Sequence, residues 1–206
     1  MEEVKKKRSG CKIFLISILV IFLIFISLIL FLILSYNSWQ KDFETQIPDN
    51  TVTEDFSMDT LEEKISESVY SGEETVALEL TTEEVSSLIL NSFQGNDSFN
   101  ITSAYIEPLE RGRWKVYLKL RILDKKEIWT ALTIRKEDRE TAEIFLEDIY
   151  IGRYSITSFG GGKLIEKINE ALTSALVTTE ENGFLGRMLE NIELLETGMV
   201  VRMEQY

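Results

Sequence analysis

The apolar and polar positions of this chain fall into three patterns, and the first is an unbroken apolar run. Positions Ile13 to Leu34 are twenty-two residues without a charge or a proline, interrupted only by Ser17 and Ser27. At ~1.5 Å per residue, a helix of this length reaches roughly 33 Å, enough to cross a hydrocarbon core of about 30 Å. The run predicts a transmembrane helix over residues 13–35.

The flanks of the run predict its orientation. The basic tail at residues 1–12 contains Lys5, Lys6, Lys7, Arg8 and Lys12. Basic residues mark the cytoplasmic side, whereas Tyr36 and Trp39 suit the opposite interface. A cleaved signal peptide is the alternative, but the run is longer than an h-region needs and no small-x-small cleavage site follows it. We therefore expect a signal anchor in a single-pass cell-membrane protein, with the lipid bilayer as partner of the helix and the C-terminal part outside the cell.

Residues 36–58 follow the apolar run, are polar and acidic, and indicate a stalk.

The second pattern is a period near 3.6, which is typical of helices. A short helix is predicted from Asp59 to Tyr70. After an alternating strand at 75–80, Thr81 and Glu84 form a capping box for a helix that ends near Gln94. A longer helix is predicted from Lys163 to Val177, with an apolar stripe that must pack on a sheet.

The third pattern has a period of two. Four strands are predicted at 99–107, 113–123, 127–135 and 141–151, joined by short polar segments. Such joins favour an antiparallel meander. The strand that begins at Arg113 has one apolar face and one wet face, and a closing hairpin is predicted at 191–195 and 199–203. The fold class is α+β: one exported domain at 59–206, with a curved antiparallel sheet packed on one long helix.

Composition narrows the classes of function. Residues 1–12 hold five of the 22 basic and two of the 35 acidic residues, so the rest of the chain has 17 basic and 33 acidic residues and a net charge of −16. Such a potential repels nucleic acid and anionic headgroups. The chain has no histidine. Its only cysteine is Cys11, ahead of the span, and this residue is either a palmitoylation site or an inert thiol. We expect no catalytic triad, no metal site and no cofactor.

Several groups of residues suggest binding, and each has a structural alternative. The glycines at 160–162 suggest an anion site or a tight joint between sheet and helix. The basic strand face, formed by Arg113, Lys115, Lys119 and Arg121, is either an anion-binding surface or one half of cross-strand ion pairs with Glu143 and Glu147. These two glutamates and Asp148 are the nearest approach to a carboxylate pair, but acids are so frequent that a cluster is expected by chance, and no enzyme is predicted. In each case we favour the structural interpretation.

Two further hypotheses concern the exported side. Asn96 and Asn100 match the N-glycosylation sequon, which matters only in a host that glycosylates. A curved sheet around an apolar helix either packs solid or leaves a groove for an acyl chain, and periodicity does not distinguish these. The candidate groove residues are Trp114, Leu118, Leu132, Ile144 and Leu172.

The order of elements carries a resemblance. An N-terminal anchor, the helix LTTEEVSSLIL, four meander strands, the exit at 151–156, the helix KLIEKINEAL and a last hairpin together resemble the YpmS-like anchored proteins of bacteria and, more distantly, the tubular lipid-binding domains. Those proteins tend to have a proline after the Ile-Gly exit, where this chain has glycines. The resemblance implies a non-enzymatic envelope protein that handles an apolar ligand or lipid. The alternative is a structural or partner-binding envelope domain with a solid core and no ligand.

Overall fold

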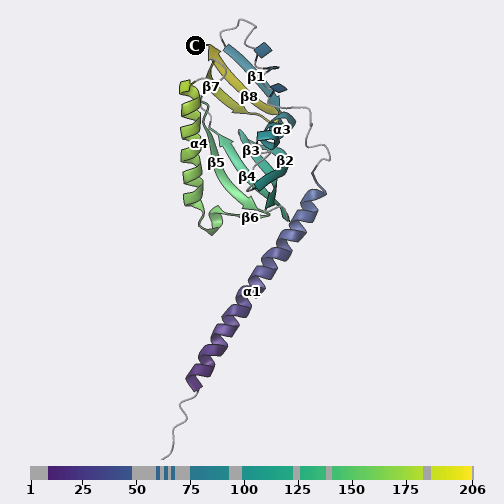
Figure 1. Ribbon diagram of the computed structural model, residues 1–206, viewed down its shortest axis with the longest axis vertical. Helices are drawn as coiled ribbons and strands as arrows, with labels where there is room; N and C mark the ends of the chain where they lie inside the picture. Colours follow the sequence, from purple (N-terminus) through teal and green to yellow (C-terminus); the bar gives the residue numbers. More distant parts are fainter. Residues whose placement is uncertain are drawn as a thin grey trace, which may run out of the picture. The chain divides into compact units, whose positions relative to one another are not determined.

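The computed structural model divides the chain into two compact units, Met1–Thr45 and Gln46–Tyr206 (Figure 1). The structure describes residues 9–47, 59–60, 63–64, 66–67, 75–92, 99–122, 126–137, 141–182 and 187–205. Among the described residues, the second unit contains antiparallel sheets and helices, so the predicted α+β class is confirmed.

The first unit is the helix α1 (Ser9–Glu44). Its stretch Ile18–Glu44 is long and apolar enough to cross a membrane, with a hydropathy of 3.4 in its most apolar window. The helix continues through residues 36–44, which were predicted as stalk. Aromatic rings stack along this extension, with ring centroids 5.8 Å apart for Tyr36 and Trp39 and 5.0 Å apart for Trp39 and Phe43. Residues at these spacings share one face of a helix, so the ring contacts favour helix here despite the polar composition.

The smaller sheet has three strands in the order β1, β8, β7. They are β1 (Thr75–Thr81), β7 (Arg187–Leu194) and β8 (Gly198–Gln205). The predicted strand at 75–80 and the closing hairpin are both present. The hairpin pairs with β1, from Thr75 opposite Glu204 to Thr81 opposite Gly198, and this pairing makes a second sheet that periodicity did not predict.

The helix α3 (Thr82–Ser92) begins with the predicted capping box. The backbone N–H of Glu84 donates to Oγ1 of Thr81 at 3.2 Å, and the N–H of Thr81 donates to Oε2 of Glu84 at 2.9 Å. Two N–H groups that a helix start leaves open are therefore satisfied. Lys64, one of the described residues of the predicted 59–70 helix, forms an ion pair with Glu84 at 2.5 Å. The predicted end of α3 near Gln94 lies outside the described residues.

The larger sheet has five strands in chain order, and the predicted meander is confirmed. The strands are β2 (Phe99–Leu109), β3 (Arg113–Ile122), β4 (Lys126–Lys136), β5 (Ile144–Ile151) and β6 (Tyr154–Ser155). Only Tyr150 and Ile151 of β5 pair with β6. The rest of β5 is therefore an edge.

The long helix α4 (Gly162–Asn182) runs beside this edge and contacts β5 and β7 (Figure 1). The side chain of Asn169 accepts a hydrogen bond from the Leu146 N–H at 2.7 Å and donates one to the Leu146 carbonyl at 2.9 Å. The Asn169 amide therefore pairs with polar backbone groups that an edge strand leaves open. A short turn, η1 (Thr157–Phe159), precedes the helix.

The position of α4 corrects one detail of the predicted core. Ile165 is buried and Ile168 is half-buried, but Leu172 is 37% exposed and Leu164 is 48% exposed. Leu172 belongs to the apolar stripe predicted for residues 163–177 to pack on a sheet, so for this residue the prediction is wrong. A helix beside a strand edge buries a narrower stripe than a helix laid across a sheet face.

The hydrophobic core joins the two sheets. One cluster contains Trp114 of β3, which is 1% exposed, together with Ile192 and Leu194 of β7. The Trp114 Nε1–H donates to the carbonyl of Leu195 at 2.8 Å, which connects the end of β7 to the larger sheet. A second cluster lies under α3 and consists of Val76, Leu78, Leu80 and Met203.

The outer face of β3 is less wet than its alternation predicts. Tyr117 was predicted on the wet face, yet it is only 6% exposed. Its ring stacks on Tyr105 with centroids 5.9 Å apart, and its hydroxyl donates to Glu107 at 2.8 Å. Burial raises the pKa of Tyr117 above its ordinary value, and the hydrogen bond to Glu107 raises it further.

Candidate functional site

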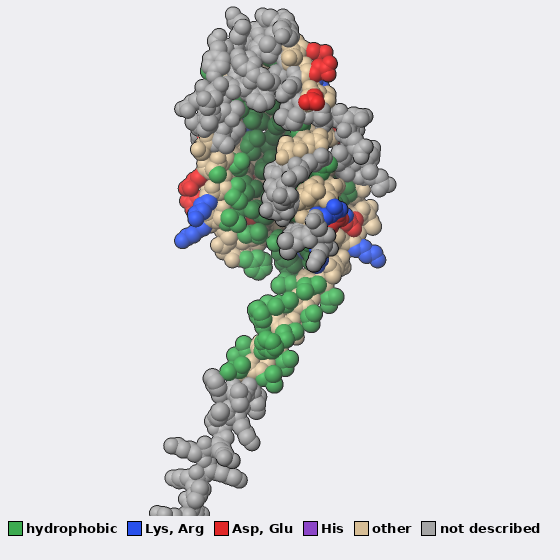
Figure 2. Space-filling model, in the orientation of Figure 1, with side chains coloured by type: hydrophobic (Ala, Val, Ile, Leu, Met, Phe, Trp, Pro, Cys, Tyr) green, Lys and Arg blue, Asp and Glu red, His purple; other side chains and the backbone are tan. Residues whose placement is uncertain are grey.

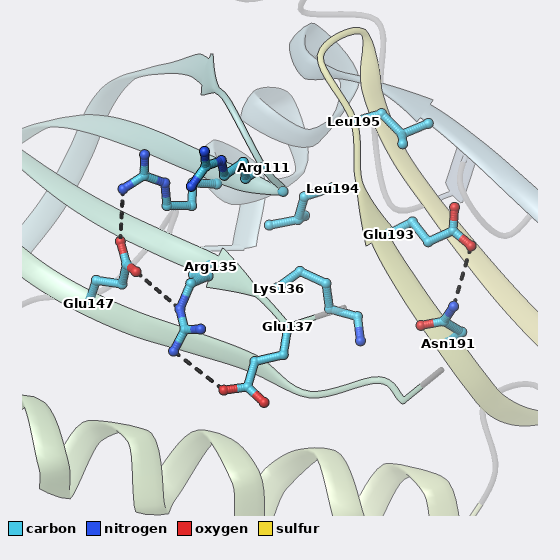
Figure 3. Close-up of a pocket in the computed structure, with 11 residues that line it drawn as sticks. Arg111, Arg135, Lys136, Glu137, Glu147, Asn191, Glu193, Leu194 and Leu195 are labelled. Carbon is cyan, nitrogen blue, oxygen red and sulfur yellow. Dashed lines mark hydrogen bonds and ion pairs between the residues drawn. The ribbon is translucent and has the colours of Figure 1, made fainter. Parts of the chain in front are cut away.

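A cleft of about 1230 Å³ lies where the ends of the two sheets meet (Figure 3). Its walls are the β2–β3 turn, the start of β3, the end of β4, the middle of β5 and the strand β7. The lining residues are Arg111, Gly112, Arg113, Arg135, Lys136, Glu137, Glu147, Asn191, Glu193, Leu194 and Leu195. Four of these side chains are cationic and three are anionic, in a chain whose part beyond Lys12 has a net charge of −16.

The β2–β3 turn forms one wall in an unusual conformation. Arg111 and Gly112 both have left-handed backbone angles, with φ of 63° and 62°. Glycine adopts this region freely, but an arginine there is uncommon and strained. The carbonyl of Gly112 accepts a hydrogen bond from the Lys136 N–H at 2.9 Å, which fixes the turn against the end of β4. The strained residue therefore lies at the cleft and not at a remote surface.

Ion pairs across the strands hold most of the charged side chains. Glu147 of β5 lies 3.0 Å from Nε of Arg135 and 3.9 Å from Arg113, and Arg135 also pairs with Glu137 at 3.4 Å. Across the described residues, no ion pair involves Arg111, which lies on the β2–β3 turn (Figure 3). Of the two predicted partners of the basic strand face, Glu147 pairs with Arg113, but no ion pair of Glu143 is found among the described residues. Glu127, which was not predicted, pairs instead with Lys119 and Arg121.

Two polar side chains are buried where they line the cleft. Lys136 is 9% exposed and Asn191 is 6% exposed. Lys136 Nζ donates to Oγ1 of Thr141 at 3.3 Å. The Asn191 amide donates to Glu193 at 3.3 Å, but its Oδ1 has no hydrogen-bond partner among the described residues. Figure 3 shows the amide of Asn191 and the ammonium of Lys136 pointing toward one another.

The buried acceptor and the buried cation define what the cleft can bind. A buried carbonyl oxygen without a partner costs about 1 to 3 kcal/mol, so a donor supplied from outside would gain by reaching it. Lys136 and Arg111 offer positive charge to the same space. Glu193 is paired with Arg202 at 2.9 Å, which reduces its repulsion of an anion. The arrangement therefore fits a group that carries a negative charge together with a hydroxyl or N–H donor.

Sequence reasoning missed these residues, although a signal was present. In β4, Lys136 shares the face of Leu132 and Ile134, so it is a cation at a position that alternation reserves for the core. A charge on a buried face is the exception that marks a functional group. Asn191 carries no comparable signal, because its burial depends on the register shift between Leu189 and Asn191 in the pairing with β8.

The predicted apolar groove residues do not gather in this cleft. Trp114 and Leu118 belong to the main core cluster, and Leu132 and Ile144 are half-buried against it. Leu172 lies on α4, with 37% of its surface exposed. A second, shallower cleft of about 920 Å³ runs between α4 and β5, and none of the five lines it.

The other predicted groups separate in space. Glu147 faces the arginines, whereas Asp148 accepts hydrogen bonds from Ser155 and Thr157, so the two carboxylates do not converge. Among the glycines, Gly160 has φ of 88°, and a side chain at Gly161 would overlap Ile156, so these two positions serve the joint. Of the sequons, Asn100 lies half-buried within β2, and Asn96 lies outside the described residues.

The fold and the cleft define the class of molecule: an α+β domain on a chain with an N-terminal apolar helix that is compatible with membrane association. The chain matches no protein-family model, no curated protein sequence and no solved structure. The resemblance to the YpmS-like proteins stays a hypothesis.

Proposed function

We propose that the chain is a single-pass envelope protein with its N-terminus in the cytoplasm and its folded domain outside the cell. The support is the apolar helix α1 and the five basic residues ahead of the apolar run. The ring contacts of Trp39 fit the opposite interface, because aromatic side chains concentrate where hydrocarbon meets water. Protease added to intact cells should digest the domain and spare residues 1–12. Digestion only after lysis would contradict this orientation.

The domain is proposed to be a non-enzymatic binding module that uses the polar cleft. The observation that carries this proposal is the pair of buried polar side chains, Lys136 and Asn191, with the amide oxygen of Asn191 unpaired within the described structure. The cleft carboxylates are ion-paired to Arg135, Arg113 or Arg202, and none stands free as a general base. A ligand with an anionic group and a hydroxyl donor, such as a polyol phosphate, would donate to the Asn191 Oδ1 and place its negative charge beside Lys136 and Arg111.

The test uses the full chain in nanodiscs with three probes: inorganic phosphate, glycerol 1-phosphate and succinate. We expect glycerol 1-phosphate to bind best because it offers both charge and hydroxyl. A hundredfold excess over the dissociation constant should stabilise the domain by about 2.7 kcal/mol. Lys136→Met and Asn191→Leu should abolish this gain, while Lys126→Met, an exposed position on the same strand, should retain it. A lack of stabilisation by all three probes would contradict the proposal.

A second candidate function is the binding of an apolar ligand or lipid, and one observation favours it. Figure 2 shows hydrophobic side chains in a strip over the larger sheet beside α4. Leu172 of α4 is exposed, and Leu132 and Ile144 of the neighbouring strands are only half-buried. Partly exposed apolar surface of this kind marks a binding groove more often than a solvated face.

A photoactivatable fatty acid tests this second candidate in the full chain. Crosslinks on peptides from β4, β5 or α4 would support a groove, and Leu172→Gln should reduce them while Met188→Gln on β7 should not. Crosslinks confined to α1 would contradict it. If both the probes of the cleft and the fatty acid fail, the structural or partner-binding domain without a ligand is the remaining proposal.

A further inference from the structure

One end of the domain combines basic charge with exposed apolar side chains. We define the tip as residues Ile151 to Ile165, which include the β5–β6 turn, η1 and the first turn of α4. These fifteen residues contain Arg153 and Lys163 and no acidic residue, although the chain beyond Lys12 has 33 acidic residues. Both cations are exposed, and among the described residues neither takes part in an ion pair. The tip is thus a basic surface on an acidic domain.

The same residues expose apolar surface. Phe159 is 74% exposed, Leu164 is 48% exposed and Ile151 is 46% exposed. Single exposed apolar residues are common, but here three lie within one segment of fifteen residues. The ring of Phe159 meets the Tyr154 ring edge-on, with centroids 6.3 Å apart. An aromatic ring next to cations is the combination that enters the headgroup region of a bilayer.

The tip is held in this shape by specific hydrogen bonds. The Asp148 carboxylate accepts hydrogen bonds from the Ser155 hydroxyl at 2.5 Å and from the Thr157 hydroxyl at 2.6 Å and N–H at 3.2 Å. The N–H of Gly160 donates to the Thr157 carbonyl at 3.0 Å, and that glycine has φ of 88°. These local hydrogen bonds therefore keep the Phe159 ring pointing outward, whereas a flexible loop would let it fold against the domain.

We propose that the tip is a membrane-contact site that binds the surface of a bilayer containing anionic lipid. The bilayer is the occupant because the chain carries its own candidate span, and the fourteen residues from Thr45 to Asp59 reach at most ~50 Å. Phe159, Leu164 and Ile151 enter the headgroup boundary, while Arg153 and Lys163 attract the phosphates. The site is independent of the polar cleft, so the failure of either proposal leaves the other intact.

The experiment labels the tip in the full chain. In a Cys11→Ser background, Ser158→Cys carries an environment-sensitive NBD dye, and the protein is reconstituted in vesicles of phosphatidylcholine alone or mixed with phosphatidylglycerol. We expect the mixed vesicles to raise the emission about twofold and shift it to shorter wavelength, since the dye enters an apolar phase. A dye at Glu196→Cys, on the exposed β7–β8 turn, should not respond.

Variants separate the two parts of the site. Phe159→Ser, or Arg153→Glu with Lys163→Glu, should remove the response, while Met188→Ser, which alters an exposed apolar residue on β7, should preserve it. Three results would overturn the proposal: no response of the tip dye in mixed vesicles, an equal response without phosphatidylglycerol, or an equal loss with Met188→Ser. A dye response that appears only when a second protein is added would assign the tip to a protein partner instead.

Discussion

The polar cleft and the tip depart from the usual burial rule in opposite directions. The cleft buries a lysine and an unpaired amide oxygen, whereas the tip exposes Phe159 and Ile151. Burial of a polar group and exposure of a large apolar one both cost free energy in an isolated domain. Under the two proposals above, a second molecule would offset these costs. The difference then lies in the partner: a polar ligand for the cleft and a bilayer surface for the tip.

The two regions also differ in what holds them. The cleft depends on contacts between distant segments, such as the hydrogen bond of 2.8 Å from Trp114 to Leu195. The tip depends on bonds within residues 148–161, centred on Asp148. The cleft should therefore fail whenever the sheets separate, while the tip should respond mainly to local changes. Substitutions at four positions test this difference, in order of decreasing effect.

The largest effect is expected for Trp114→Ala. The side chain is 1% exposed and joins the sheets, so its removal leaves a cavity and should cost about 3 to 5 kcal/mol of unfolding free energy. Trp114→Phe keeps most of the ring and loses the bond to Leu195, for a cost of about 1 kcal/mol. Chemical denaturation of the detergent-solubilised chain, followed by circular dichroism, measures both. Equal losses for the two variants would show that packing does not join the sheets here.

A smaller loss is expected for Asp148→Asn, about 1 to 2 kcal/mol, because several hydrogen bonds to a charged acceptor are weakened. Burial tends to raise the pKa of Asp148, but the hydrogen bonds from Ser155 and Thr157 outweigh it and lower the pKa below its ordinary value. The stabilisation is therefore complete above the unfolded pKa and is lost as pH falls below about 4, through the folded pKa. Unfolding at several pH values should show this loss for the natural chain and not for the variant.

Asn191→Leu should leave the unfolding free energy unchanged or raise it by up to ~1 kcal/mol, since it replaces an unsatisfied buried acceptor with an apolar side chain. This outcome would separate binding from folding at the cleft, because the same variant is expected to lose glycerol 1-phosphate. Thermal unfolding with and without the probe measures both quantities. A loss of more than about 2 kcal/mol, the usual cost of disrupting a buried site, would assign Asn191 to the fold instead.

The smallest effect is expected for Phe159→Ser. Because the ring is 74% exposed, its loss should change the unfolding free energy by less than about 0.5 kcal/mol. Hydrogen exchange of residues 148–161 should also stay the same, since Asp148 and the backbone bonds of η1 are retained. Increased exchange across this segment would mean that the ring shapes the tip, and that the tip is not held by Asp148 alone.

The features that the sequence by itself determined are those with local causes. The apolar run, the Thr81 and Glu84 capping box, the strands of the meander and the closing hairpin all follow from side-chain spacing and short joins. Each depends on residues close together in the chain, so periodicity and turn chemistry are sufficient to predict it. Even here the end of α1 was missed, because ring contacts extend a helix that polar composition would end at residue 35.

The tertiary structure decided the features that depend on distant residues. The pairing of β8 with β1 makes a second sheet, and the junction of the two sheets creates the cleft around Lys136 and Asn191. The placement of α4 beside the edge of β5 leaves Leu172 exposed, although its spacing is that of a core residue. A period shows which side chains share a face, but only the fold determines what that face meets.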